Sequence, residues 1–214
     1  MRLYIVRHGE TDWNRERRVQ GHSDIPLNEY GIHLAEQTAE GMKDIPLDMA
    51  YTSPLMRARQ TAEILLAGRD IPILESEEIQ ELGFGIYEGM CCSGEHKTAE
   101  SEVFKRFFTD TGHYVPAEGG ESVQALMERT GKFLKELCAD VKLREKQILV
   151  STHGAAMTAL LNQVRGNLEI ADFWKWEVPP NCAVTIVEVQ DGIPSIVEEN
   201  VIYYKEPVKL WSVE

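Results

Sequence analysis

The amino-acid sequence predicts an α/β fold: a three-layer sandwich with a mainly parallel central sheet, helices on both faces and a helical insertion over the active site. Short apolar runs alternate along the chain with segments of helical character, which is typical of a parallel sheet covered on both faces. Two of these runs end in the same dipeptide, His8-Gly9 and His153-Gly154. Because ligands of open α/β sheets bind at the carboxyl ends of the strands, we expect both histidines at one site.

Length and composition are those of an ordinary globular protein. The chain has 214 residues, of which 43% are hydrophobic and 27% charged, enough for a large core. We expect one domain over residues 1–214, with an insertion at about residues 90–121. No apolar run has the length of a membrane helix and no signal region is seen, so we expect a cytoplasmic protein that contacts no membrane. The net charge of −13 disfavours nucleic acid as a partner.

The predicted strands are short apolar runs bounded by polar or turn-forming residues, at 3–6, 47–53, 71–74, 147–152 and 183–189. The predicted helices lie between them, at 28–43, 54–66, 100–108, 122–141 and 155–164. Asn28 is a good N-cap for the first of these helices. Ser53 followed by Pro54 predicts the start of the second. That start puts Arg57 in the first helical turn, at the same edge of the sheet as His8.

Two segments lack a regular pattern. Residues 79–89 are rich in glycine and aromatic residues, and a long irregular segment inside a compact domain is more often functional than idle. The insertion follows it directly and is well placed to act as a lid. The four cysteines, Cys91, Cys92, Cys138 and Cys182, lack metal-site spacing, so reduced thiols are the simplest interpretation.

Six residues at strand ends or in irregular segments form the candidate constellation: Arg7, His8, Asn14, Arg57, Glu81 and His153. Guanidinium groups bind phosphate oxygens in bidentate fashion, and a neutral imidazole can attack phosphorus. A carboxylic acid can protonate a leaving alkoxide and then activate water. The set lacks the ligand cluster of a catalytic metal, so we expect phosphoryl transfer without metal or cofactor. Spacing alone does not choose between Glu81 and Glu88 as the acid.

The motif Arg7-His8-Gly9-Glu10-Thr11, with Asn14 after it, resembles the signature of the histidine phosphatase superfamily, the phosphoglycerate mutase-like fold. Further blocks are similar and come in the family's order: 18–21, 24–27, 53–62, 81–89, 119–122 with Arg129, and 151–154. The resemblance implies that His8 is the phosphorylated nucleophile and Glu81 the proton donor and later base. It also implies a phosphoryl group held by Arg7, Arg57, His153 and Asn14, in a pocket lined by Thr11, Gln20, Gly21 and Gly154.

We therefore expect a metal-independent phosphatase that hydrolyses small-molecule phosphate monoesters through a phosphohistidine on His8. The alternative is a cofactor-dependent phosphoglycerate mutase. Mutases usually carry paired arginines in the insertion, where this chain has Lys97, Lys105 and Arg106. A non-catalytic module that binds a phosphorylated ligand is disfavoured, because His8 and Glu81 are both present.

The expected partner is a small phosphorylated metabolite, and His22 is a further substrate-contact candidate. The C-terminal tail carries Tyr203, Tyr204 and Trp211. These aromatic residues could pack on their own domain or on a second subunit, so a homodimer is open.

Overall fold

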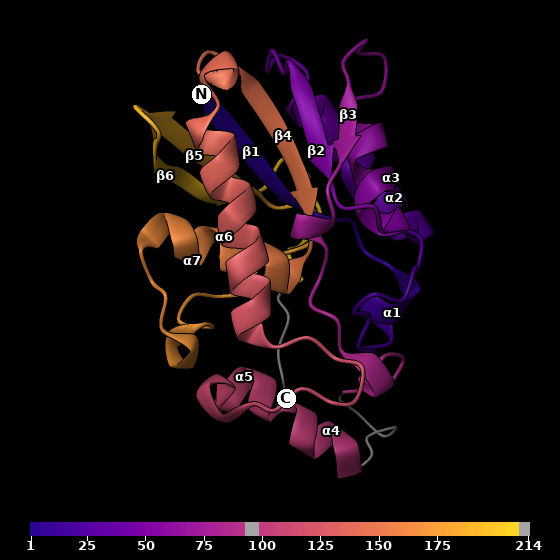
Figure 1. Ribbon diagram of the computed structural model, residues 1–214. Coiled ribbons are helices and arrows are strands. Elements are labelled where there is room, and N and C mark those ends of the chain that lie inside the picture. Colours follow the sequence, from indigo (N-terminus) through magenta and orange to yellow (C-terminus); the bar gives the residue numbers. More distant parts are fainter. Residues whose placement is uncertain (93–98, 210–214) are drawn as a thin grey trace.

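The computed structural model describes residues 1–92 and 99–209 (Figure 1). Lys97 and Trp211 lie outside the described residues. The central sheet has six strands in the order β3-β2-β4-β1-β5-β6. The strands are β1 (Arg2–Arg7), β2 (Met49–Thr52), β3 (Ile73–Glu75), β4 (Gln147–Thr152), β5 (Val184–Gln190) and β6 (Ile193–Val201). Neighbouring strands from β3 to β1 run parallel, whereas β5 is antiparallel to both β1 and β6. The predicted mainly parallel sheet is confirmed.

Helices cover both faces of this sheet, as predicted (Figure 1). They are α1 (Asp12–Arg15), α2 (Glu29–Gly41), α3 (Met56–Leu65), α4 (Ala99–Phe104), α5 (Arg106–Thr109), α6 (Val123–Ala139) and α7 (Gly154–Arg165). Side chains of a strand alternate between faces. Accordingly, Leu3 and Ile5 of β1 pack with α6 and α7 on one face, and Tyr4 and Val6 pack with α2 and α3 on the other. None of the described helices combines the length and apolar character needed to cross a bilayer.

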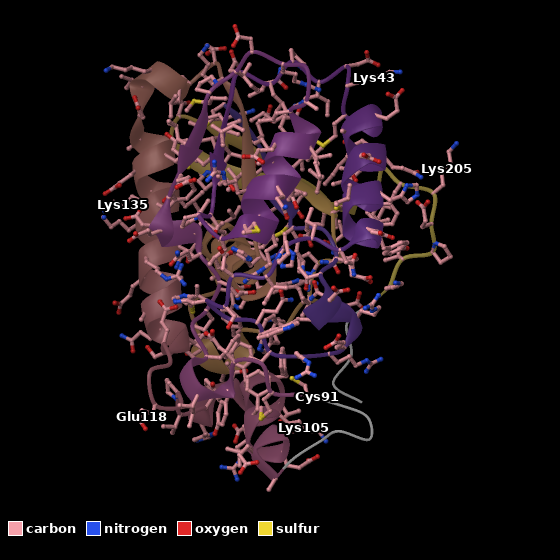
Figure 2. The ribbon with its side chains drawn as sticks, turned by 90° about the vertical axis from the view of Figure 1, so that its right-hand side faces the viewer. Lys43, Cys91, Lys105, Glu118, Lys135 and Lys205 are labelled. Carbon is pink, nitrogen blue, oxygen red and sulfur yellow. The ribbon has the colours of Figure 1, made fainter. Side chains whose placement is uncertain are left out.

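The insertion lies beyond the carboxyl edge of the sheet. Its aromatic side chains join Phe84 and residues of α6 and α7 in a third apolar cluster, apart from the two that flank the sheet. Figure 2 shows Cys91, Lys105 and Glu118 together at the end of the molecule opposite Lys43. The predicted insertion over the strand ends is thus present, although its single predicted helix is divided into α4 and α5 around Lys105.

The predicted cap of α3 is wrong. The helix begins at Met56 with Leu55 at its N-cap, and no side chain caps it. Met56 N instead donates to Asp24 Oδ1 at 2.6 Å. The hydroxyl of Ser53 lies 2.7 Å from Nε2 of His153, so the serine predicted as a cap belongs to the site.

The sequence prediction also missed the edge strand β6. Asp191 and Gly192 connect β5 to β6 and both have positive φ angles, 50° and 80°. An Asp-Gly pair between two strand-forming runs is a strong signal for a two-residue hairpin. Of the tail residues, Tyr204 is buried in the cluster that contains α2 and α3, with Tyr203 packed against it. They therefore pack on their own chain.

Candidate active site

His8 directly follows β1 at the carboxyl edge of the sheet. The parallel register pairs Arg7 with Thr152, and His8 N donates to Thr152 O at 2.9 Å. His8 Nδ1 lies 2.7 Å from its neighbour's carbonyl oxygen, Gly9 O. A carbonyl can only accept, so Nδ1 carries the proton and Nε2 has the free lone pair. Burial, together with the charges of Arg57 and Arg7, lowers the pKa of His8 well below its ordinary value of 6.5. The imidazole is therefore neutral and able to act as a nucleophile.

Two buried guanidinium groups flank His8. Arg57, in the first turn of α3, donates to Gly21 O at 2.7 Å and to Ser23 O at 2.8 Å. Arg7 donates through Nη1 to Pro179 O at 2.7 Å. Burial lowers the pKa of Arg57 to about 10, which leaves it cationic at neutral pH. The Nε atoms of Arg7 and Arg57 are buried and find no acceptor among the described residues. Buried donors without acceptors are costly, and an anion would satisfy them.

His153 follows β4 and lies beside His8, with ring centroids 5.2 Å apart. Burial and the nearby Arg57 charge lower its pKa well below 6.5 as well. Both imidazoles are therefore neutral. Ser53 hydrogen-bonds to Nε2 of His153, and Nδ1 is buried without a partner among the described residues. The two His-Gly motifs thus meet because their strands are parallel neighbours in matching register.

The carboxyl group of Glu81 lies at the start of α7. Its Oε2 accepts from Ala155 N at 3.2 Å, and its Oε1 accepts from Ala156 N at 3.1 Å and from Leu82 N at 2.9 Å. Free N–H groups at a helix N-terminus favour a negative charge there. Glu81 is therefore held as a hydrogen-bond acceptor at the edge of the site.

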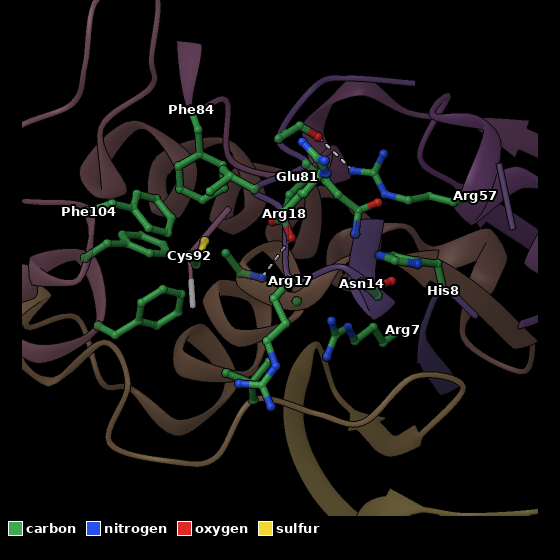
Figure 3. A pocket seen from close by; sticks show the side chains of 18 of the residues that line it. Arg7, His8, Asn14, Arg17, Arg18, Arg57, Glu81, Phe84, Cys92 and Phe104 are labelled. Carbon is green, nitrogen blue, oxygen red and sulfur yellow. Dashed lines mark hydrogen bonds between the residues drawn. The ribbon is translucent and has the colours of Figure 1, made fainter. Parts of the chain in front are cut away.

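One pocket contains most of the predicted site residues (Figure 3). Of those residues, Arg7, His8, Asn14, Gln20, Gly21, Arg57, Glu81 and Gly154 line it. His153 and Thr11 are buried and do not line it. Thr11 caps α1, and its hydroxyl lies within 3.2 Å of Asn14 Oδ1 and 3.0 Å of Gln20 Oε1. Thr11 is thus not among the residues that line the pocket, and its hydroxyl contacts two residues that are.

A profile of the histidine phosphatase superfamily (branch 1) matches residues 3–202. The chain belongs to this superfamily. The match covers all of the strands except Arg2, the first residue of β1, and it includes every residue of the site described above. The resemblance inferred from the sequence motifs is confirmed.

Relatives in the superfamily include both phosphatases and mutases. The chain is 34% identical to an uncharacterized phosphatase, PhoE, of Bacillus subtilis (strain 168) over 163 residues, and the aligned region covers 76% of each chain. It is 33% identical over 193 residues to a probable phosphoglycerate mutase, GpmB, of Escherichia coli, covering 90% of this chain and 87% of the relative. The solved structure of YhfR from Bacillus stearothermophilus superposes with a TM-score of 0.81 at 32% identity, covering 94% and 98% of the two chains.

Glu88, the alternative candidate for the acid, forms hydrogen bonds outside the pocket of this histidine phosphatase. Its carboxylate accepts from His22 N, Ser23 Oγ and Phe84 N at 2.7–3.1 Å, and it does not line the pocket. His22 likewise stays outside the lining, and its Nε2 donates to Glu81 O at 2.8 Å. Both residues thus support the loop segments that carry the site.

Arg129 of α6 is a second support that sequence reasoning named only as part of a motif. It donates to the carbonyl oxygens of Glu78, Gln80 and Glu81 at 2.8–2.9 Å. Its guanidinium also forms an ion pair with Glu121, at 2.7 Å. Arg129 therefore fixes the backbone of residues 78–81, which carries the Glu81 side chain.

Sequence reasoning missed the far wall of the pocket. This wall is apolar and comes from four separate segments: Phe84, Cys92, Phe104, Phe107, Phe108, Trp174 and Val178. The i, i+3, i+4 spacing of the three insertion phenylalanines indicates a shared helix face, but not what that face contacts. Arg17 and Arg18 also line the pocket.

Proposed function

We propose that this protein hydrolyses small phosphate monoesters through a covalent phosphohistidine on His8. The observation that supports it most is a neutral, buried imidazole whose Nε2 is free, placed between two buried guanidinium groups. A metabolite-sized substrate agrees with a pocket enclosed by the sheet edge and the insertion. Family membership and the relative PhoE point to the same reaction class.

In the first step, Nε2 of His8 attacks phosphorus, and an N–P bond forms as the P–O bond to the alcohol breaks. Arg7 and Arg57 bind the non-bridging oxygens and stabilise the charge that spreads over them. Asn14 lines the same pocket, and His153 lies beside His8 with ring centroids 5.2 Å apart. Both are assigned to the group that binds the phosphoryl oxygens. Glu81, as a carboxylic acid, donates its proton to the departing oxygen.

In the second step, Glu81 acts as the base. Its carboxylate takes a proton from water while the water oxygen attacks phosphorus, and the N–P bond breaks to release inorganic phosphate. His8 returns to its neutral form and Glu81 is again protonated. The three backbone N–H groups around Glu81 fix the position of its carboxyl group in both steps.

Phosphate release from a panel of metabolite monoesters tests the proposal, with the covalent intermediate detected by mass after a neutral quench. We expect His8→Ala to abolish both turnover and labelling, since the imidazole that would form the N–P bond is then missing. The control is His113→Ala, which alters an exposed histidine of the insertion and should retain both. Turnover in His8→Ala contradicts the proposal, and loss of activity with a chelator contradicts its metal-free chemistry.

A second candidate function is phosphoglycerate mutase, which the relative GpmB favours. Incubation with 3-phosphoglycerate separates the two functions, because a phosphatase releases inorganic phosphate and a mutase yields the isomerised phosphoglycerate. We propose that phosphate is the main product. A single domain over residues 1–214, a cytoplasmic location and a homodimer stay predictions, and light scattering measures the last of these.

A further inference from the structure

Ser53 is a buried polar residue at the carboxyl edge of the sheet, and the reaction steps proposed above give it no role. It directly follows β2, which lies beside β4 in parallel register, with Thr52 paired to Ser151. Ser53 N continues this pairing by donating to Ser151 O at 3.0 Å. The strand ends thus bring the Ser53 hydroxyl to 2.7 Å from Nε2 of His153, which follows β4.

The two nitrogens of the buried His153 ring have different surroundings. Nε2 contacts the Ser53 hydroxyl, whereas Nδ1 is buried and has no hydrogen-bond partner among residues 1–92 and 99–209. Burial and the charge of Arg57 hold the pKa of His153 well below 6.5, so the ring is neutral and carries a single proton. The nitrogen that carries this proton decides whether Nδ1 offers a ligand a donor or a lone pair.

The hydrogen bonds of the Ser53 hydroxyl distinguish the two tautomers of His153. A hydroxyl has one proton to donate and two lone pairs, and Leu55 N already donates to Ser53 Oγ at 3.3 Å. If the hydroxyl donates to Nε2, its proton is used and the imidazole proton is on Nδ1. If Nε2–H donates to Oγ instead, the hydroxyl proton has no acceptor in the described part of the chain. A buried donor without an acceptor is costly, so the Nδ1–H tautomer is favoured.

With its proton on Nδ1, His153 matches the two guanidinium groups of the proposed phosphate cradle, which consists of Arg7, Arg57 and His153. Arg7 Nε, Arg57 Nε and His153 Nδ1 are all buried and all lack a partner among the described residues. The His153 ring lies beside the His8 ring, and Gly154, the residue after it, lines the pocket. In the Nδ1–H tautomer all three nitrogens are donors, as an oxyanion requires. In the other tautomer, Nδ1 would present a lone pair that repels phosphoryl oxygen.

Resting on the proposed function, we propose that Ser53 is a positioning residue that keeps the proton of His153 on Nδ1, where it donates to the phosphoryl group. The hydrogen bond that one ring nitrogen makes determines whether the other carries the proton, and the Ser53 hydroxyl makes this bond to Nε2. Ser53 does not line the pocket. It therefore acts through His153 and does not touch the substrate.

Nitrogen NMR of the chain with isotope-labelled histidine rings locates the proton directly, and His153→Ala identifies the His153 signals by their loss. We expect the proton on Nδ1 in the wild type. In Ser53→Ala it should move to Nε2, because the neighbouring guanidinium charges then favour a lone pair on Nδ1.

The matched control is Ser151→Ala, which removes another buried serine hydroxyl at the same sheet edge. That hydroxyl donates to Ala58 O at 2.8 Å, so the His153 proton should stay on Nδ1 in this variant. A proton on Nε2 in the wild type, an unchanged tautomer in Ser53→Ala, or the same change in Ser151→Ala overturns the role of Ser53.

Calorimetric binding of inorganic phosphate provides a second readout that needs no turnover. We expect Ser53→Ala and His153→Ala each to weaken phosphate binding about tenfold or more, as for the loss of one hydrogen bond to a charged group. Since Ser53 acts through His153, the double variant should bind within about twofold of His153→Ala alone. Losses that multiply in the double variant overturn the proposal.

These two measurements also separate the role of Ser53 from the proposed function. Absence of turnover with every ester, together with a proton on Nδ1 and the expected phosphate binding, contradicts the proposed function and leaves the role of Ser53 intact. Hydrolysis through His8 with the His153 proton on Nε2 overturns the role of Ser53 alone.

Discussion

Glu88 offers a sharp test of how the site is supported. Its carboxylate connects the backbone of the 81–89 segment, at Phe84 N, to the loop that contains His22 and Ser23. The carbonyl oxygen of Ser23 in turn accepts from Arg57. Replacing Glu88 by alanine removes this connection. We therefore expect Glu88→Ala to lower both stability and activity, although Glu88 lies outside the pocket.

The size of the effect follows from the groups left without a partner. A buried N–H that loses its acceptor costs about 1–3 kcal/mol. Phe84 N is partly buried and bears most of that cost, whereas the exposed His22 N can bind water. We expect Glu88→Ala to lower the free energy of unfolding by about 2 kcal/mol. Since displacement of a binding group by about 1 Å can cost about 100-fold, a loosened Arg57 should reduce kcat/KM by up to that factor.

Urea unfolding and steady-state kinetics measure the two effects, with Glu88→Gln and Glu81→Gln for comparison. Glu88→Gln keeps one acceptor oxygen and should lie near wild type in both. Glu81→Gln removes the proposed proton donor and should lower kcat by about 10²–10⁴-fold. If Glu88→Gln loses as much activity as Glu81→Gln, the assignment of the acid is wrong. If Glu88→Ala unfolds at the wild-type urea concentration, its bridging role is refuted.

Three further predictions concern stability and the phosphate cradle. Because burial keeps the pKa values of His8 and His153 well below 6.5, the unfolded chain binds more protons below that pH. The free energy of unfolding should therefore fall with falling pH, by up to about 1.4 kcal/mol per pH unit for each histidine. The urea midpoint should depend less steeply on pH in His153→Gln than in the wild type. Equal slopes in the two proteins would contradict this. Lysine cannot reproduce the two diverging donors by which Arg57 binds Ser23 O and Gly21 O. Arg57→Lys should therefore lower kcat/KM about 100-fold or more. A loss of less than tenfold would contradict the proposed role of Arg57 in phosphate binding. Gly85→Ala places a Cβ 2.1 Å from a backbone oxygen at φ +55° and should lower the free energy of unfolding by about 2 kcal/mol or more. Gly68→Ala, at a positive φ but with open space around the Cβ, should lower it by about 1 kcal/mol. Equal thermal unfolding temperatures for the two variants would contradict the steric argument.

Much of the site could be predicted because it depends on strand ends. An apolar run that stops at His8 or His153 predicts where the carboxyl edge of the sheet lies, and parallel pairing then brings the two rings together. Arg57 could be placed for the same reason, since it follows a strand and opens a helix. The N-cap of this helix could not be predicted, because Ser53 contacts His153, which is distant in the sequence and is not indicated by any local pattern.

The remaining features depend on contacts between distant segments. Glu81 and Glu88 belong to one glycine-rich segment, and only their hydrogen-bond partners distinguish them. Thr11 has the polarity of a lining residue, but its hydroxyl is turned toward its neighbours Asn14 and Gln20. The apolar wall of the pocket requires Phe84, the insertion and Trp174 to converge. Helical spacing predicts one apolar face in the insertion but does not identify what that face contacts.

The separation of the apolar clusters has a consequence for engineering. Arg7 and His8 follow a strand packed in the two cores that flank the sheet, whereas the apolar wall of the pocket belongs to the third cluster. Leu82, Ala155 and Ala156, whose backbone N–H groups donate to Glu81, belong to the third cluster as well. A variant with an exchanged insertion should therefore be assayed for turnover and for selectivity, because the insertion packs on the segments that hold the proposed acid.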